Sequence, residues 1–245
     1  MAFDPKPPFP WTVAETIGWS FVVLIIFVAV SHGIAFCYIL LQALQNRSLS
    51  LQQLSQNIET DGQLLSIATG IAGLCSSGFL YGLIKHRSVK TIAPCLGLQT
   101  PRPSAWLIWN LLLLLVILFS DSILRALEQS QTFTEQIYQT SPNPALLYIT
   151  LVLIAPIFEE FLFRGFMLAG LRSSRVGSMG AVIVTSLLWA MLHFQYNFYF
   201  VAQIFVFGLL LGVARLQTES LYVPISMHSL NNLIALITTG INLSS

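Results

Sequence analysis

The chain has 245 residues, of which 55% are hydrophobic and only 9% are charged, and its mean hydropathy is +0.76. A water-soluble domain carries about 25% charged residues, so this composition excludes a soluble fold and predicts an outer surface that faces the lipid bilayer. The formal net charge of +1 gives no electrostatic basis for binding nucleic acid. The three cysteines form no CxxC pair, so neither a structural disulfide nor a thiolate zinc site is indicated.

Apolar stretches long enough to cross a membrane recur along the whole chain. A bilayer core requires about 20 apolar residues per helix. The candidate spans run approximately over 16–44, 64–84, 105–127, 145–171, 178–196, 198–216 and 220–241. We therefore expect an all-α fold, a polytopic transmembrane helical bundle of about seven spans.

Basic residues predict how the bundle is oriented, because cytoplasmic loops carry an excess of Lys and Arg. With a cytoplasmic N-terminus and seven spans, Arg47 and Arg125 fall outside. The remaining basic loop residues fall inside: Lys6, Lys85, Arg87, Lys90, Arg102, Arg172, Arg175 and Arg215. This distribution favours a multi-pass integral membrane protein with its N-terminus in the cytoplasm.

Two GxxxG patterns occur in the spans, at Gly78 and Gly82 and at Gly208 and Gly212. Small residues one helical turn apart let two membrane helices approach closely. We expect both patterns to serve helix packing and assign them no catalytic role.

The fourth span contains three ionisable residues at membrane depth, where charged groups are costly and need a partner or a function. Glu160 and Arg164 are four residues apart on one helical face and can pair. Glu159 points about 100° away on an ideal helix and has no local cation. A carboxyl group beside a second carboxylate in a low-dielectric setting is typical of a general acid or base. The alternative is a buried ion network that only orders the bundle.

Polar groups on two later spans lie at a similar depth. His193 follows Trp189 by one turn, and His228 and Asn232 are four residues apart on one face. An imidazole and an amide together can stabilise an oxyanion, although interhelical hydrogen bonding would explain them equally well. At 1.5 Å per residue, Glu159 and these three groups lie roughly 12 to 22 Å from the inner ends of their spans.

The three elements together resemble the CPBP family of CAAX proteases and bacteriocin-processing enzymes, also called Abi. They are Glu159-Glu160-x-x-x-Arg164, then Trp189-x-x-x-His193, then His228-x-x-x-Asn232. The resemblance covers about 145–240, which divides the chain into an N-terminal membrane region (1–143) with three spans and a CPBP-like catalytic helical core (144–245). It implies an intramembrane endopeptidase, a peptide hydrolase whose active site is buried within the bundle.

The resemblance also implies a role for each matching residue. Glu159 would activate the attacking water with the help of His193, His228 and Asn232 would stabilise the oxyanion, and Glu160 and Arg164 would support the site. Trp189 stands where the family commonly has Phe, and we expect either ring to wall a dry pocket. The implied partners are a peptide or membrane-protein substrate and the lipid bilayer, without nucleic acid, in a bacterial cell membrane.

The family has been described both as metal-dependent and as a glutamate-type protease. Zinc is possible if Glu159, His193 and His228 converge, but the sequence has no HExxH motif. The Arg164 pairing occupies one carboxylate, and Asn232 is a poor zinc ligand. We therefore favour catalysis without a cofactor.

Other functions remain open or are disfavoured on specific grounds. A two-aspartate protease requires two intramembrane aspartates, and only Asp121 is even marginally placed. A rhomboid-like serine site requires a GxSG-type element, which is missing from the sequence. A proton-coupled membrane transporter would also use intramembrane Glu and His, although no inverted repeat is visible. A non-catalytic membrane adaptor that retains the site is the other alternative.

Overall fold

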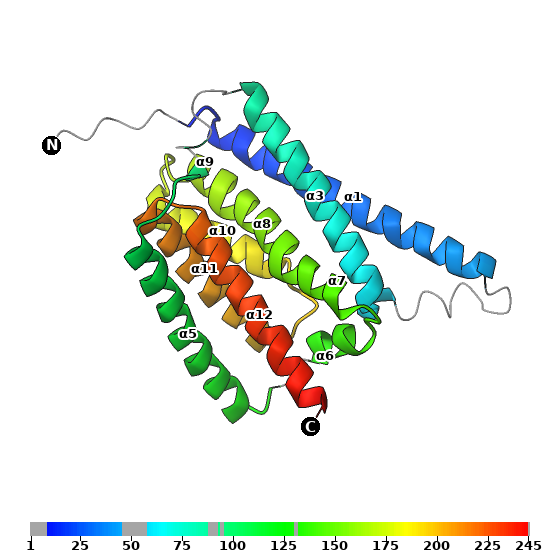
Figure 1. Cartoon of the computed structure of the whole chain (residues 1–245). Coiled ribbons are helices and arrows are strands. Elements are labelled where there is room, and N and C mark those ends of the chain that lie inside the picture. Colours follow the sequence, from blue (N-terminus) through cyan, green and yellow to red (C-terminus); the bar gives the residue numbers. More distant parts are fainter. Residues whose placement is uncertain (1–8, 46–57, 88–92, 94–95, 130–131, 245) are drawn as a thin grey trace.

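The computed structural model describes residues 9–45, 58–87, 93, 96–129 and 132–244. Within these ranges the chain forms helices and the turns that join them, with no β-strand, so the predicted all-α bundle is confirmed (Figure 1). Lys6, Arg47 and Lys90, which contributed to the predicted orientation, lie outside the described residues.

Among the described residues before the predicted fourth span, three helices are long and two elements are short. These are α1 (Val13–Gln45), the 3-10 helix η1 (Ile58–Thr60), α3 (Gly62–Arg87), α5 (Pro103–Ala126) and α6 (Thr132–Gln139).

The predicted fourth span is one continuous rod in which the helix type changes along its length. It comprises α7 (Pro144–Tyr148), the π-helix η2 (Ile149–Ile154), α8 (Ala155–Glu160), the π-helix η3 (Phe161–Met167) and α9 (Leu168–Leu171). Three helices complete the bundle: α10 (Gly177–Met191), α11 (Phe198–Thr218) and α12 (Tyr222–Ser244).

Consecutive rods run in opposite directions, and contacts between their ends show this. Arg87 at the end of α3 pairs with Glu15 at the start of α1, with 2.7 Å between Nη1 and Oε1. At the other end of the bundle, Asn197 before α11 donates from Nδ2 to Gln129 Oε1 after α5, at 3.0 Å. The described N-terminal and C-terminal ends of the chain therefore lie at opposite ends of the bundle (Figure 1).

The number of spans differs from the prediction of about seven. Among the described residues, five helices are long and apolar enough to cross a membrane: α1, α3, the rod Pro144–Leu171, α5 and α11. The predicted span 178–196 is wrong at its C-terminal end, because α10 stops at Met191 and is only 15 residues long. α12 has 23 residues, but His228, Asn231 and Asn232 lower its hydropathy. α10 is therefore too short to count as a span, and α12 is too polar, because it carries His228 and Asn232.

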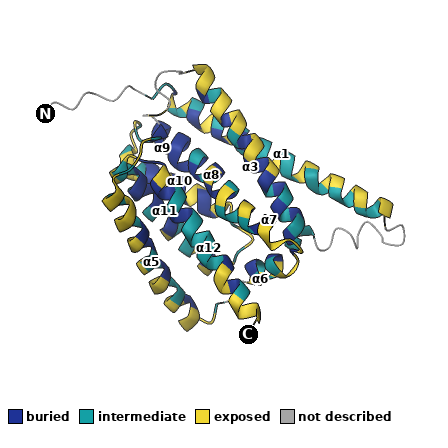
Figure 2. Cartoon of the chain, in the orientation of Figure 1, coloured by how far each residue is buried: buried dark blue, intermediate teal, exposed yellow. Residues whose placement is uncertain are grey.

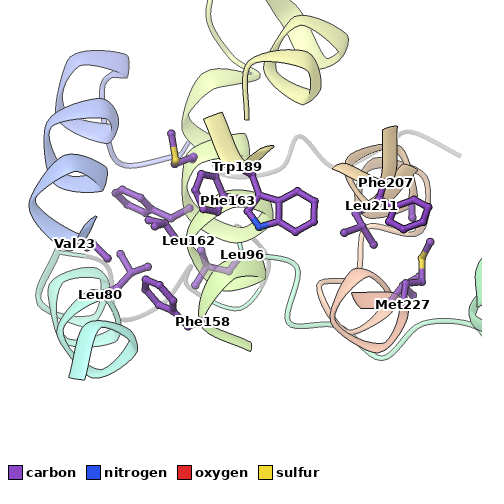
Figure 3. Close-up of a cluster of buried hydrophobic side chains, with 14 of the residues drawn as sticks. Val23, Leu80, Leu96, Phe158, Leu162, Phe163, Trp189, Phe207, Leu211 and Met227 are labelled. Atoms are coloured by element: carbon purple, nitrogen blue, oxygen red, sulfur yellow. The ribbon is translucent and has the colours of Figure 1, made fainter. Parts of the chain in front are cut away.

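The fourth rod lies at the centre of the molecule and carries most of the buried surface. Figure 2 shows α8 and α9 largely buried, whereas α1 is mostly exposed or half-buried along its length. The largest buried cluster joins residues of the fourth rod, such as Phe163 and Leu162, to Val23 of α1, Leu80 of α3 and Phe207 of α11 (Figure 3). The predicted N-terminal region therefore packs directly on the segment that carries the two glutamates.

Only one of the two GxxxG patterns packs against another helix of the chain. A Cβ at Gly212 would lie 2.7 Å from Val182 Cγ1, and one at Gly208 would lie 2.8 Å from Ser186 Cβ, so α11 approaches α10 closely along this face. A Cβ at Gly78 or Gly82 would meet no described atom within 4 Å. The packing prediction is therefore confirmed for the second pattern and is wrong, within this chain, for the first.

This difference predicts opposite effects of the same substitution. Gly212→Ala should lower the free energy of unfolding by about 1–3 kcal/mol, because the stiff Val182 side chain leaves no room for a methyl group. Gly82→Ala should be neutral or slightly stabilising, since alanine favours a helix more than glycine by about 1 kcal/mol. Thermal unfolding of the two variants in detergent measures both effects, and equal melting temperatures would contradict the described α10–α11 contact.

Candidate active site

A cavity of about 340 Å³ lies inside the bundle and is bounded by the four residues singled out as catalytic. Glu159 reaches it from α8, His193 from the turn after α10, and His228 and Asn232 from α12. The rest of the wall is mostly apolar, with Phe and Leu side chains from α1, α6 and α11 among its members. Groups that are far apart in the sequence therefore share one space, shielded by apolar neighbours.

The π-helix before Glu159 explains why Asn232 points at this rod. The N–H of Ala155 donates to Thr150 O, five residues back, instead of to Leu151 O as in an α-helix. Pro156, which has no N–H, follows directly. The carbonyl of Leu151 is thus left without its helical donor, and Asn232 Nδ2 supplies one at 2.8 Å. Asn232 therefore provides the hydrogen bond that the Leu151 carbonyl lacks, and this bond links α12 to the fourth rod.

Glu160 is held by two cationic or proton-donating partners and is fully buried. Its Oε1 lies 3.0 Å from Arg164 Nη1 and 2.9 Å from His228 Nδ1. Arg164, also fully buried, donates from Nη2 to Gly208 O on α11 at 3.2 Å. The Glu160–Arg164 pair expected from their spacing is present, and it extends to a histidine that the sequence did not connect to it.

Glu159 has a different environment from its neighbour. Its side chain is 21% exposed, and its Oε2 accepts a hydrogen bond from Trp189 Nε1 at 2.5 Å. His228 Nε2 lies 4.0 Å from the same oxygen. Glu159 thus borders the cavity beside one neutral donor and one imidazole, whereas Glu160 is enclosed with a guanidinium.

The two histidines are each fixed through Nδ1. His228 Nδ1 faces Glu160, and His193 Nδ1 lies 2.9 Å from the backbone carbonyl of Trp189. A ring that donates from Nδ1 and is otherwise neutral has an acceptor at Nε2. Tyr196 stacks on His193, with ring centroids 6.3 Å apart and planes inclined by 25°.

Sequence reasoning missed three features of the site. It treated Trp189 as a wall, although the indole N–H contacts Glu159 directly. It gave no role to Tyr196, which stacks on His193 and has its hydroxyl 3.3 Å from Thr134 Oγ1. The bond from Asn232 to Leu151 depends on the π-helix, for which Pro156 was the only signal.

The geometry does not support the three-ligand zinc alternative. In the part of the chain that the structure describes, no group of three His, Cys, Asp or Glu side chains is placed to hold a metal ion, so Glu159, His193 and His228 do not form a ligand set. The close pair Glu159–His228 supplies only two donors, fewer than the three protein ligands of a catalytic zinc site.

The buried ion network predicts a large cost when one member is removed. Arg164→Met leaves the Glu160 carboxylate without its cation, so the free energy of unfolding should fall by about 3–5 kcal/mol. Denaturant titration of the purified protein, followed by circular dichroism, measures this loss. The double variant Glu160→Gln/Arg164→Met, which removes both charges, should be more stable than Arg164→Met alone. If Arg164→Met alone unfolds at the wild-type denaturant concentration, the pair contributes no net stability.

Comparison with known proteins connects this geometry to a family. Residues 141–234 match the family model described as type II CAAX prenyl endopeptidase Rce1-like, and all six predicted site residues lie within that segment. An uncharacterized 24.3 kDa protein of Escherichia coli is 38% identical over 89 residues, which is 36% of this chain and 41% of that relative. The chain thus aligns with about two fifths of that protein's length. No solved structure matches. Over residues 141–234 the chain is similar to the Rce1-like family of CAAX prenyl endopeptidases, in agreement with its resemblance to the CPBP family.

Proposed function

We propose that the protein is an intramembrane endopeptidase in which Glu159 activates water for the hydrolysis of a peptide bond. One observation carries the proposal: of two adjacent glutamates, Glu160 is enclosed by Arg164 and His228, whereas Glu159 borders a shared cavity and pairs with no Lys or Arg among the described residues. A supporting carboxylate needs fixed partners, as Glu160 has. A general base needs access to the cavity, as Glu159 has. The match of residues 141–234 to the family model of a CAAX prenyl endopeptidase supports the same reaction.

In this mechanism a water molecule in the cavity is held by Glu159 and His193. The water donates one hydrogen to the Glu159 carboxylate and the other to Nε2 of His193, which is an acceptor when Nδ1–H donates to the Trp189 carbonyl. A lone pair of the water oxygen is then free to attack a peptide carbonyl carbon. The proton moves to Glu159 as the new C–O bond forms.

His228 and Asn232 supply the donors for the oxyanion of the tetrahedral intermediate. His228 donates from Nε2 when its ring carries both protons, with Glu160 stabilising the Nδ1–H side. Asn232 uses one amide hydrogen on Leu151 O and retains the second, because a side-chain amide has two N–H donors. The C–N bond then breaks, and Glu159 returns its proton to the leaving amine.

The substrate that suits this site is a peptide or membrane protein that enters an apolar cavity. The wall offers Phe27, Phe133, Phe163 and Phe207 together with leucines, and few charges. A segment of low polarity loses little hydration on entering such a space, whereas a charged segment would lose much. Prenylated C-terminal peptides, which the family description names, are one such class.

Replacing Glu159 with Gln tests the proposal, because glutamine keeps the size of the side chain and cannot accept the proton of the water. We expect cleavage of a membrane-peptide substrate to fall by about a hundredfold to ten-thousandfold, the contribution typical of a general acid or base, with the thermal stability unchanged. Glu135→Gln on α6 is the matched control and should retain activity. The assay uses purified protein in proteoliposomes, with mass spectrometry of the released peptides.

Two results would overturn the assignment. Full peptide cleavage by Glu159→Gln would remove the proposed base. Solute or proton uptake that depends on Glu159, without cleavage of any membrane peptide in the wild-type proteome, would indicate transport in place of hydrolysis.

We further propose that the protein lies in a bacterial cell membrane with its N-terminus in the cytoplasm. The seven alternating rods place Arg87, Arg102, Arg172 and Arg175 at the end of the bundle where the described chain begins. That end carries the basic excess expected on the cytoplasmic side.

Thiol labelling in intact cells tests the orientation. With the native cysteines replaced by serine, Arg175→Cys should react with a membrane-impermeant maleimide only after the cells are permeabilised. Gln139→Cys, at the end of α6 on the opposite side of the bundle, should react in intact cells. The reverse pattern would show that the N-terminus is outside.

A further inference from the structure

Trp189 contacts Glu159, Arg164 and both histidines of the candidate site. Its indole N–H donates to Glu159 Oε2, and its backbone carbonyl lies 2.9 Å from His193 Nδ1. Its ring centroid lies 5.1 Å from that of His193 and 5.2 Å from that of His228, in edge-to-face arrangements in both cases. Arg164 Cζ lies 4.5 Å from the centroid on the ring face.

The indole is itself firmly held. Trp189 is 4% exposed and belongs to the largest buried cluster, together with Phe163, Phe207 and Met227 (Figure 3). A side chain packed on this scale has little rotamer freedom, so the direction of its N–H is fixed by the core and not by Glu159. Glu159, at 21% exposure, is the less enclosed partner of the two.

From these contacts we infer that Trp189 is a positioning residue, whose indole N–H holds Glu159 Oε2 so that Oε1 is presented to the water in the cavity. This inference rests on the proposed function of Glu159 as the base. Oε1 accepts no hydrogen bond from any residue that the structure describes, whereas Oε2 is bound by Trp189 and lies nearest to His228 Nε2. The two oxygens are thereby distinguished.

The chemistry of the indole suits this task better than that of a charged donor. An indole nitrogen only donates and carries no charge, so it can orient the carboxylate without competing for the proton that Glu159 takes from water. A guanidinium or ammonium in the same place would hold Glu159 as an ion pair, as Arg164 holds Glu160. The face of the ring lies against Arg164, which pairs with Glu160. The N–H edge of Trp189 therefore contacts Glu159 directly, whereas its face contacts the partner of Glu160.

A phenylalanine in this position would keep the ring contacts and lose the N–H. The expectation that either ring serves equally well as a wall is therefore incomplete for this chain, because only tryptophan can supply the bond to Glu159. Trp189→Phe thus isolates the hydrogen bond from the packing.

Steady-state kinetics of Trp189→Phe in the full-length protein provide the first test. We expect kcat to fall about tenfold to a hundredfold, the effect of one hydrogen bond to a charged group, with KM changed less than about twofold, because the indole N–H acts on the base and not on the substrate. Trp106→Phe, at an exposed position on α5, is the matched control and should retain the wild-type kcat. A wild-type kcat in Trp189→Phe would overturn the inference.

A spectroscopic test does not depend on activity. In protein labelled with ¹⁵N at tryptophan, the five indole N–H groups give separate signals, and Trp189→Phe identifies the one that belongs to Trp189. Glu159→Gln should shift that signal upfield, because a neutral amide is a weaker acceptor than a carboxylate, and leave the other four in place. An unmoved Trp189 signal would show that the hydrogen bond is not formed.

The two variants distinguish a failure of the proposed function from a failure of the proposed role of Trp189. Active Glu159→Gln contradicts the proposed function itself. Inactive Glu159→Gln together with fully active Trp189→Phe leaves the proposed function standing and removes only the role of Trp189.

Discussion

The site depends on the enclosure of one carboxylate, that of Glu160, by Arg164 and His228. A charge taken out of water inside a helical bundle is tolerated only when its partners satisfy it there, and this network draws its members from the fourth rod and α12, with Gly208 of α11 accepting from Arg164. It therefore fixes how three rods face one another. Once Glu160 is bound in this way, Glu159, the preceding residue on the rod, faces a different direction and borders the cavity.

Those parts of the arrangement that depend on local interactions could be predicted from the sequence. The pairing of Glu160 with Arg164 follows from a spacing of four residues on a helix, and the all-α bundle follows from the scarcity of charge. The four candidate residues could be expected to share a depth, because depth depends on position along a span. They line one cavity in the structure.

The remaining contacts could not be predicted because they depend on how helices rotate against each other. The bond from Asn232 to Leu151 requires the π-helix that precedes Pro156, which shifts the register of every later residue on that rod. The bond from Trp189 to Glu159 requires the indole edge of one helix to face another. The end of α10 at Met191 was missed since Leu192, Phe194 and Tyr196 continue an apolar and aromatic pattern between the polar residues that follow.

The short length of α10 affects how water can reach the candidate site. Fifteen residues rise only about 22 Å, less than the roughly 30 Å of hydrocarbon in a bilayer. If α10 begins at one headgroup layer, the bends from Leu192 to Asn197 lie within the hydrocarbon region, where irregular backbone persists only against protein or hydrated space. His193 belongs to that segment and to the cavity wall. Under the proposed function, the short α10 would let hydration extend inward as far as His193, where the attacking water is proposed to bind.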